Sequence, residues 1–193
     1  MFADLLRERI GGRVVLSGSQ VSQLLAHYEL LLKWNRRLSL TSIESPAEIV
    51  ERHYCESLFA GSLLPEGRLT VVDVGSGAGF PGVPIAILRP ESEFVLVESH
   101  QRKAVFLMEA CRGLKNVRVL ALRAEAVVET FDWMVSRAVS YADLGSVLRV
   151  APNVMLLGGE EAPGKTGDIR WGQPAQLPWG KRRYVYIGQR SGE

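Results

Sequence analysis

Cysteine and histidine are scarce in this chain, which has two cysteines and three histidines among 193 residues. Cys55 and Cys111 fit no metal-binding spacing, so we expect both to be reduced residues of the core. His27, His53 and His100 are too scattered along the sequence to form a metal site. His27 is expected on the exposed surface of a helix. The composition therefore predicts no metal centre.

Long hydrophobic runs and an excess of one charge are also missing. No apolar run approaches the roughly 18 residues of a membrane-spanning helix, and the first residues lack the order of a signal peptide. We therefore expect a cytoplasmic protein without a membrane partner. The net charge of +2 excludes a strongly basic surface, so any contact with nucleic acid must come from a local patch. With 47% hydrophobic residues, the chain is expected to form one compact unit, and we expect a monomer.

Two segments differ in their hydrophobic pattern. Residues 1–66 have helical spacing, and the pattern predicts an N-terminal helical segment packed on the core. Its expected helix starts are Ser17 or Ser19, and Ser45-Pro46 followed by Glu48. Residues 67–193 alternate between the two types of element, which predicts an α/β fold with a doubly wound, mainly parallel sheet. The expected strands are 69–74, 93–98, 117–121, 132–136, 153–157 and 183–188, and the expected helices are 83–89, 101–113 and 141–149. The last strand is expected to be an antiparallel edge strand. Residues 158–180 are expected to form an irregular loop.

A glycine-rich loop follows the first of these strands. The strand contains Asp73, and Gly75, Gly77 and Gly79 come directly after it. Glycine has no Cβ, so a ligand could lie directly on the main chain there. In an open parallel sheet, nucleotide-like ligands bind in the crevice outside the strand ends. The loop therefore predicts a cofactor site.

An acidic residue ends the second strand. Glu98 lies 23 residues after Gly75, where a carboxylate accepts hydrogen bonds from the hydroxyls of a ribose. The alternative is a solvated charge at a strand end. Combined with the loop, the position favours ribose binding.

The glycines allow two kinds of cofactor. Residues 77–82 satisfy the dinucleotide pattern G-x-G-x-x-G, so a NAD-type oxidoreductase is one alternative. Against it, the glycines begin earlier, at Gly75, and Asp73 adds a polar group. Pro81 and Pro84 also shift the helix start and lack an N–H for a pyrophosphate. The arrangement resembles the cofactor loop of class I S-adenosylmethionine-dependent methyltransferases, whose cofactor has no pyrophosphate.

A longer series of motifs resembles one family in the order of the motifs and in the spacing between them. These motifs are similar to those of the bacterial small-subunit (16S) ribosomal RNA guanine-N7 methyltransferases, also called glucose-inhibited division protein B. The likeness covers roughly residues 24 to 157, and its Gly-Phe-Pro-Gly context is more specific than any glycine pattern. The motifs are Tyr28, Leu31-Leu32, Trp34-Asn35, Leu40-Thr41, His53 with Ser57-Leu58, residues 72–87, Glu98-Ser99, Arg102-Lys103, Phe106-Leu107, residues 123–125, Phe131-Asp132 and residues 136–138.

The resemblance implies a Rossmann-like fold, S-adenosyl-L-methionine as cofactor and methyl transfer to a guanine N7 in 16S rRNA of the small ribosomal subunit. Arg123-Ala-Glu125 is implied to form the adenine pocket, although the tripeptide could merely begin a surface helix. No catalytic residue is assigned, apart from a positioning candidate, Arg137. The cofactor-binding residues that the resemblance implies are Asp73, Gly75, Ser76, Gly77, Gly79, Phe80, Glu98, Ser99, Ala124, Glu125 and Arg137.

Arg137 follows the fourth strand and is the candidate for a positioning role. Its guanidinium fork could hold the carboxylate of the cofactor or the O6 of a guanine. We favour the carboxylate, because the residue follows a sheet strand at the cofactor crevice.

Contacts with RNA are expected from clusters of basic residues, each of which could instead be a solvated face. Trp34 could stack on a base, but core packing is the expected role for it. The candidates for phosphate contacts are Lys33, Arg36, Arg37, Arg102, Lys103, Lys165, Lys181, Arg182 and Arg183.

Two positions depart from the family pattern. Leu157 stands where the fifth strand of the family leads into a lysine–glycine pair, and Glu56 stands where the family usually has aspartate. Both departures leave the predicted cofactor residues unchanged and bear on the identity of the substrate. A non-catalytic RNA-binding module on a methyltransferase scaffold is therefore a further alternative.

Overall fold

The computed structural model describes residues 1–137, 140, 144–145, 147–164 and 167–191. The helices are α1 (Phe2–Ile10), α2 (Gly18–Asn35), α3 (Pro46–Ile49), the π-helix η1 (Val50–Cys55), α4 (Glu56–Ser62), α5 (Gly82–Leu88), α6 (Gln101–Ala110) and the 3₁₀ turns η2 (Ala124–Ala126) and η3 (Leu148–Val150). The strands are β1 (Thr70–Val74), β2 (Glu93–Val97), β3 (Val117–Leu120), β4 (Trp133–Arg137), β5 (Asn153–Gly158), β6 (Ile169–Trp171), β7 (Ala175–Gln176) and β8 (Tyr184–Arg190).

The strands form one mixed sheet in the order β3-β2-β1-β4-β5-β8-β6, with β7 also paired to β8. The first five strands in this order are parallel, and β8 is antiparallel to β5. The direction of chain progression reverses between β1 and β4, which confirms the predicted doubly wound sheet. Their carboxyl ends, at Val74 and Ser136, lie side by side in the register. This is the switch point where open sheets of this kind bind ligands.

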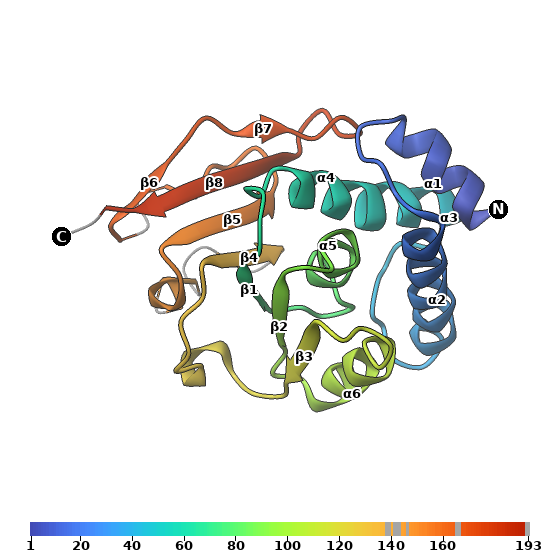
Figure 1. Cartoon of the computed structure of the whole chain (residues 1–193), viewed down its shortest axis with the longest axis horizontal. Helices are drawn as coiled ribbons and strands as arrows, with labels where there is room; N and C mark the ends of the chain where they lie inside the picture. Colours follow the sequence, from blue (N-terminus) through green and yellow to red (C-terminus); the bar gives the residue numbers. More distant parts are fainter. Residues whose placement is uncertain (138–139, 141–143, 146, 165–166, 192–193) are drawn as a thin grey trace.

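Alternate residues of the central strands face two separate hydrophobic layers. Val71, Phe94 and Val135 pack on the helical side, while Val72 and Val95 pack on the other side. Figure 1 shows α1, α2, α4, α5 and α6 grouped on the helical side. Segments between residues 127 and 151 cover the other side. Because both faces are covered, the strands carry apolar residues at successive positions, as parallel sheets do.

The N-terminal helices share one core with the sheet domain. Leu6 of α1, Leu24 of α2 and Tyr54 of η1 belong to the same buried cluster as Phe80 and Phe106. The N-terminal helices therefore pack directly against the part of the chain that forms the sheet. Over residues 1–66, all of which are described, the regular elements are helices and there is no strand.

The helix start at Ser17 is confirmed. Its hydroxyl accepts a hydrogen bond from the Gln20 N–H, and the Gln20 side chain accepts one from the Ser17 N–H. The prediction for His27 is wrong, because this residue of α2 is only 2% exposed. His27 lies three residues after Leu24 and four before Leu31, so it lies on the buried stripe of the helix.

The helix start at Ser45-Pro46 is confirmed as well, since the Ser45 hydroxyl accepts a hydrogen bond from the Glu48 N–H. The elements that follow form one continuous helical run to Ser62. Its middle part, η1, is a six-residue π-helix. Widened turns of this kind occur frequently at functional sites.

Two expectations for the C-terminal third are wrong, and a third falls partly outside the described residues. The region 158–180 is not wholly irregular, because β6 and β7 pair with β8. As a result β8 is antiparallel but does not form the edge, since it has β5 on one side and β6 and β7 on the other. The expected helix 141–149 falls partly on residues 141–143 and 146, which lie outside the described residues. The 3₁₀ turn η3 covers its last part.

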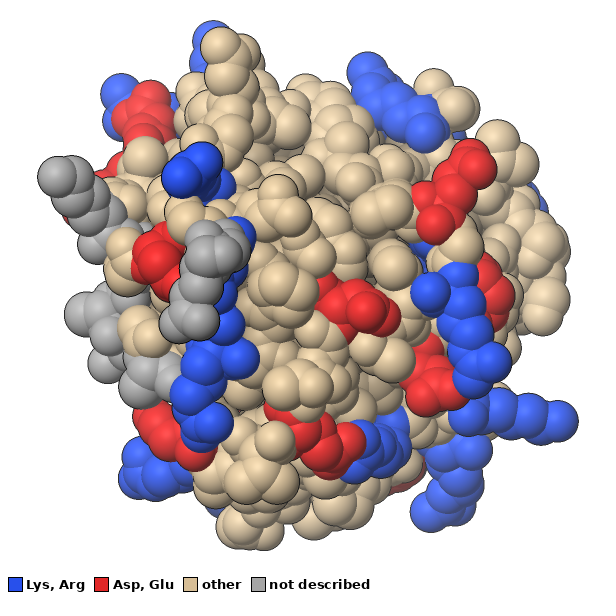
Figure 2. Space-filling model, turned by 60° about the vertical axis from the view of Figure 1, so that its left-hand side comes forward, with Lys and Arg blue, Asp and Glu red and all other residues tan. Residues whose placement is uncertain are grey.

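The charged residues on one face of the molecule are mixed. In Figure 2, Lys and Arg side chains lie beside Asp and Glu side chains around the rim, and uncharged residues cover much of the centre. Any basic patch therefore has to be sought elsewhere on the surface. No helix in the described part of the chain is long and apolar enough to cross a membrane.

Candidate functional site

The glycine-rich loop after β1 is held against the end of β2. The N–H groups of Gly75 and Ser76 donate to the carbonyl oxygen of Val97, at 3.0 and 3.1 Å. Gly75, Gly77 and Gly79 all have positive φ angles, between 56° and 88°. Residues with a Cβ adopt such angles at a cost, so the three glycines are required by the backbone of the loop.

Glu98 connects this loop to α6. Its Oε2 accepts a hydrogen bond from the Gly77 N–H at 2.9 Å, and its Oε1 accepts one from the His100 N–H at 2.7 Å. The residue is 8% exposed. A carboxylate has about four acceptor sites, so each oxygen can still accept a hydrogen bond from a ligand hydroxyl.

A cavity of about 380 Å³ lies at the carboxyl ends of β1, β2 and β3, and we call it the β1–β3 cavity. Gly75, Ser99, Ala124 and Glu125, four of the predicted cofactor residues, line it. Apolar side chains such as Val97 provide surface for a ring. The lining residues are Val74, Gly75, Val97, Ser99, Leu122, Arg123, Ala124, Glu125, Leu144 and Val147.

Other predicted cofactor residues lie beneath the loop. Asp73 is fully buried, and its Oδ2 accepts a hydrogen bond from the Gly82 N–H at 2.9 Å. Burial raises the pKa of this carboxyl to about 7. The Ser76 hydroxyl donates to the backbone oxygen of Asp73, at 2.9 Å. Asp73 and Ser76 thus hold the loop and the start of α5 in place.

The position of Gly82 bears on the dinucleotide alternative. A Cβ on Gly82 would lie 2.5 Å from Asp73 Oδ2, so only glycine fits. In the register 77–82, the Gly82 N–H would be among the donors at the helix start that face a pyrophosphate. Here that N–H is used by Asp73. The loop therefore fits a cofactor without a pyrophosphate better.

A second cavity, of about 440 Å³, lies at the carboxyl ends of β4 and β5, and we call it the β4–β5 cavity. It contains Arg137, the last residue of β4, and Leu157, its partner in the register of β5. Three arginines give it a positive lining. The lining residues are Leu40, Thr41, Ser42, Ile43, Arg52, His53, Arg137, Leu157, Gly158, Gly159 and Arg183.

Arg137 is fixed by three neighbours. Its Nη1 donates to the Arg52 carbonyl oxygen at 2.8 Å, and its Nη2 donates to His53 Nδ1 at 2.9 Å. The guanidinium carbon also lies 5.2 Å from the centre of the Phe80 ring. Burial lowers the pKa of Arg137 to about 10, so the side chain stays charged at neutral pH. Arg137 lines the β4–β5 cavity and not the β1–β3 cavity.

His53 is a neutral hydrogen-bonding link in the same cavity. Its Nδ1 accepts from Arg137, so its Nε2 carries the proton and donates to Thr41 Oγ1 at 2.8 Å. Burial, followed by the nearby charge of Arg137, lowers the pKa of His53 to about 3. The imidazole stacks on Phe80, with ring centres 4.6 Å apart. Phe80 of the glycine loop thus supports the β4–β5 cavity from below.

Glu56, the position that departs from the family pattern, pairs with Arg183. Glu56 is fully buried, and its Oε2 lies 2.6 Å from Arg183 Nη2. Burial raises the pKa of the Glu56 carboxyl, and the bond to Arg183 opposes this shift. The pair ties the residue before β8 to α4 beside the cavity.

His27 supports the glycine loop from α2 and was missed as a site residue. Its Nδ1 accepts a hydrogen bond from the Tyr54 hydroxyl at 2.7 Å, and its Nε2 donates to the Ala78 carbonyl oxygen at 3.1 Å. Burial lowers the pKa of His27 to about 4, so the ring is neutral. The helical spacing with Leu24 and Leu31 was the signal that could have identified it.

The predicted RNA-contacting residues are distributed over separate places. Lys33, Arg36, Arg37 and Arg102 line a common hollow of about 410 Å³. Lys103, on α6, is not among the residues that line it. Lys181 and Arg182 are exposed, Arg182 pairs with Glu160, and Arg183 pairs with Glu56. Lys165 lies outside the described residues.

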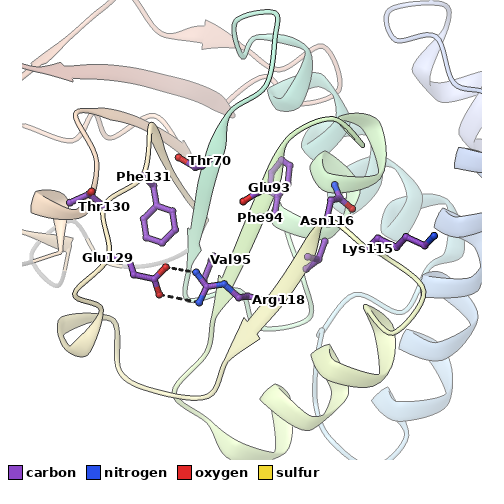
Figure 3. Close-up of a pocket in the computed structure, with 11 residues that line it drawn as sticks. Thr70, Glu93, Phe94, Val95, Lys115, Asn116, Arg118, Glu129, Thr130 and Phe131 are labelled. Carbon is purple, nitrogen blue, oxygen red and sulfur yellow. Dashed lines mark hydrogen bonds and ion pairs between the residues drawn. The ribbon is translucent and has the colours of Figure 1, made fainter.

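A hollow of about 270 Å³ lies at the opposite, amino edge of the sheet. Figure 3 shows Thr70 and Glu93, at the starts of β1 and β2, with Phe131 and the Arg118–Glu129 pair around it. Arg118 donates hydrogen bonds from Nη1 and Nη2 to the two oxygens of the Glu129 carboxylate. Neither the glycine loop nor any other predicted cofactor residue lines this hollow. Among the described residues, no group of three or more His, Cys, Asp or Glu side chains is placed to hold a metal ion.

Comparison with known families decides the class of the chain. The family model GidB, described as rRNA small subunit methyltransferase G, matches residues 20–155. The chain belongs to this family. The matched range agrees with the extent of the resemblance expected from the motifs. The glycine loop, Glu98, His53 and Arg137 all lie within it.

Curated relatives agree with the GidB assignment. The ribosomal RNA small subunit methyltransferase G of Nitrosococcus oceani is 45% identical over 129 residues, which are 65% of this chain and 59% of the relative. That of Methylococcus capsulatus is 39% identical over 161 residues, which are 79% of this chain and 78% of the relative. The chain thus spans about six tenths of the length of the first relative.

Solved structures confirm the fold of this GidB family chain. A SAM dependent methyltransferase from Aquifex aeolicus aligns with a TM-score of 0.61 and 18% identity, covering 79% of this chain and 97% of that one. Aeropyrum pernix fibrillarin, solved with natively bound S-adenosyl-L-methionine, aligns with a TM-score of 0.51 and 14% identity, covering 62% and 66%. The chain therefore has the class I methyltransferase fold.

Proposed function

We propose that the chain is an S-adenosylmethionine-dependent methyltransferase that modifies N7 of a guanine in 16S rRNA of the small ribosomal subunit. The observation that carries the proposal is the pair of cavities at the carboxyl edge of one sheet. One is lined by Gly75 of the glycine loop together with Ser99, Ala124 and Glu125, and the other by Arg137 and His53. They lie at the ends of strands on the two sides of the switch point between β1 and β4. Family membership supports the same substrate class.

The β1–β3 cavity fits the proposed cofactor. A Cβ at Gly77 would have only the Gly75 oxygen within 4 Å, at 3.8 Å, so the space above this part of the loop is open. Glu98 has acceptor capacity for the ribose hydroxyls, and Val97 and Leu122 offer apolar contact to the adenine. The N–H groups at the start of η2, near Ala124 and Glu125, have no partner within their own turn. They are the proposed donors to the adenine ring.

The residues of the chain then act mainly by positioning. The bound cofactor supplies a methyl group that its sulfonium charge already activates. Guanine N7 has a free lone pair at neutral pH, so no side chain has to remove a proton. Alignment of the two reactants by a rigid site contributes on the order of 7–11 kcal/mol. The fixed geometry of Arg137, His53 and Phe80 is suited to this task.

Arg137 has two candidate roles, and its surroundings favour the one opposite to the prediction from sequence. Arg137 lines the β4–β5 cavity and does not line the β1–β3 cavity. This position favours contact with guanine O6 or a phosphate over contact with the cofactor carboxylate. In that role, Arg137→Ala depresses methyl transfer and leaves the affinity for S-adenosylmethionine nearly unchanged. Calorimetric titration of wild type, Arg137→Lys and Arg137→Ala distinguishes the roles. A loss of cofactor affinity that lysine restores only in part would assign Arg137 to the carboxylate.

Leu157 motivates the alternative of a non-catalytic RNA-binding module. It lies in the β4–β5 cavity beside Arg137, so the family lysine is replaced by an apolar residue at the proposed substrate site. Arg137 forms no ion pair with another of the described residues, so it still gives this cavity a positive charge, which supports retained recognition of an anionic substrate.

The deciding experiment is transfer of a tritiated methyl group. Naked 16S rRNA, assembled small subunits and a panel of small molecules are offered in parallel, and the modified base is mapped. Label at guanine N7 in either RNA sample is the expected result, and a protein that binds the cofactor but transfers nothing would be the non-catalytic module. Calorimetry with S-adenosylmethionine against NAD tests the oxidoreductase alternative. The proposal includes a cytoplasmic location, because the ribosomal subunits are found in the cytoplasm.

A further inference from the structure

A hollow lined mainly by cationic side chains lies between the C-terminal end of α2 and α6, separate from both carboxyl-edge cavities. Its volume is about 410 Å³, and we call it the basic groove. We propose that the basic groove binds the phosphate backbone of the substrate RNA near the target guanine, an inference that rests on the proposed function. Its lining residues are Lys33, Trp34, Arg36, Arg37, Leu38, Arg102 and Glu109.

The cations of the groove have no ion-pair partner in the part of the chain that the structure describes. Lys33, Arg36, Arg37 and Arg102 are exposed, and none of them forms an ion pair with another of the described residues. Glu109 is the only acid of the lining. The net charge of the whole chain is only +2, so this cluster is a local concentration of positive charge. Such a concentration attracts a polyanion.

Trp34 and Glu109 form a fixed wall of the groove. The indole Nε1 donates to Glu109 Oε2 at 3.1 Å, and the indole packs edge-on against Phe106 with ring centres 5.8 Å apart. The indole is therefore held in the protein and is not offered as a stacking platform. The groove thus offers charge without base readout, which suits a phosphate backbone.

The segment after α2 connects the groove to the β4–β5 cavity. Arg36, Arg37 and Leu38 line the groove, and Leu40 to Ile43 line the cavity. Asn35 holds the segment, because its Oδ1 accepts from the N–H groups of Leu40 and Thr41, at 2.7 and 2.9 Å.

This connection limits the separation of the two sites. Arg37 and Thr41 are four residues apart, so their Cα atoms are at most about 14 Å apart. At 3.4 Å per nucleotide of a stacked strand, this is a span of about four nucleotides. A strand whose guanine enters the cavity therefore carries neighbouring phosphates over the groove.

A protein partner is the less suitable occupant. The apolar members of the lining are Leu38, which is buried, and Trp34, which is partly buried and held by Glu109. The buried centre of a protein interface is usually depleted of charge and rich in aromatic and apolar groups. The groove has the opposite composition.

The test uses a double variant and a charge-matched control. Arg36→Ala with Arg37→Ala removes two cations from the groove. Arg112→Ala with Lys115→Ala removes two exposed cations that line neither the groove nor a carboxyl-edge cavity. Binding of naked 16S rRNA, of a single-stranded RNA oligonucleotide and of assembled small subunits is measured without cofactor between 50 and 300 mM salt.

The groove variant is expected to bind both RNAs about tenfold or more weakly at low salt. Its slope of log K against log salt should be shallower by about 1.4, which is two phosphate contacts at about 0.7 each. The control should behave as wild type, and all three proteins should bind S-adenosylmethionine equally. Equal slopes for the groove variant and wild type would overturn the proposal. A loss confined to assembled subunits, with naked RNA unaffected, would overturn it in favour of a ribosomal protein.

The readouts also separate this inference from the proposed function. Groove-dependent RNA binding without any methyl transfer would remove the enzymatic function and leave the groove as an RNA site. If the protein methylates rRNA and the groove variant has the RNA affinity and the KM of wild type, the proposed function would stand and the groove would not be an RNA site.

Discussion

The carboxyl and amino edges of the sheet carry cavities lined by residues of the same strands, but their polar groups are paired differently. At the carboxyl edge, Glu98 is 8% exposed, and both of its oxygens accept backbone N–H groups while keeping further acceptor capacity. At the amino edge, Arg118 and Glu129 pair with each other while their side chains are 51% and 47% exposed. Arg68 and Glu93 pair in the same way.

The difference shows where a ligand can gain binding free energy. Exposed charged groups that already pair with each other gain little binding free energy from a new partner. A nearly buried carboxylate with acceptor capacity left gains a charged hydrogen bond without a large further loss of solvation. The strands are common to both edges, so the loops at their ends produce the difference.

The largest effect is expected from a glycine-to-valine substitution at the carboxyl edge, with the same substitution at the amino edge as its control. Gly77→Val places a branched side chain in the open space above the loop at a φ of 56°, and should weaken binding of S-adenosylmethionine on the order of 100-fold. Gly67→Val, at a φ of 97° before β1, imposes similar backbone strain and should leave this affinity unchanged. Calorimetry measures both, and circular dichroism checks that both fold. Equal affinities would show that the loop only turns the chain.

A second pair of variants compares the two ends of β2. Glu98→Ala removes the proposed ribose acceptor and should weaken cofactor binding by about 1.5–3 kcal/mol, roughly 10- to 150-fold. Glu93→Ala, at the start of the strand, removes an exposed acid paired with Arg68 and should not change the affinity. If the two variants bind alike, Glu98 does not belong to the site.

The support of the carboxyl edge by His27 predicts a pH effect. Because burial lowers the folded-state pKa of His27 to about 4 from 6.5, its neutral form stabilises the fold above pH 6.5. This contribution is lost as the pH falls from 6.5 towards 4, by about 2 kcal/mol between pH 7 and pH 5.

The His27→Gln variant isolates this contribution, because other buried groups such as Asp73 are common to both proteins. The Gln side chain can still donate to the Ala78 oxygen. Urea unfolding at pH 7 and pH 5 should show a drop in stability that is smaller in the variant by about that amount. Parallel pH profiles would contradict the neutral, buried state of His27.

The smallest effect is expected at the amino edge itself. Arg118→Ala breaks a pair whose side chains are about half exposed, so the free energy of unfolding should fall by less than about 1 kcal/mol. Cofactor affinity should remain that of wild type. A clear loss of cofactor binding would mean that the two edges are coupled through β3, and the contrast between them would fail.

Local sequence signals predicted much of the fold and the cofactor-side loop. The glycines, the strand before them and the Ser17 cap depend on interactions within a few residues, which a sequence pattern records directly. His27 was misplaced because its polar character was weighted above its helical spacing. Its partners, Tyr54 and Ala78, are far away in the sequence.

Features that depend on distant pairing could not be predicted. β6 and β7 form in a segment rich in glycine and proline because β8 provides hydrogen-bond partners. The β4–β5 cavity joins Thr41, His53, Arg137 and Arg183, which no sequence spacing relates. The separation of Arg137 from the β1–β3 cavity likewise required the three-dimensional arrangement.

The π-helix η1 has a consequence for how this chain tolerates change. Each residue of an α-helix turns the following residues by about 100°. The wide turn at Val50–Cys55 therefore sets the angle between the part of the helix that presents Ile49 to the core and the part that presents Glu56 to Arg183. Closing this turn to a regular α-helix without removing a residue would rotate one part by roughly 100° away from its partners. The width of this turn therefore decides whether Ile49 and Glu56 can face their separate partners at the same time.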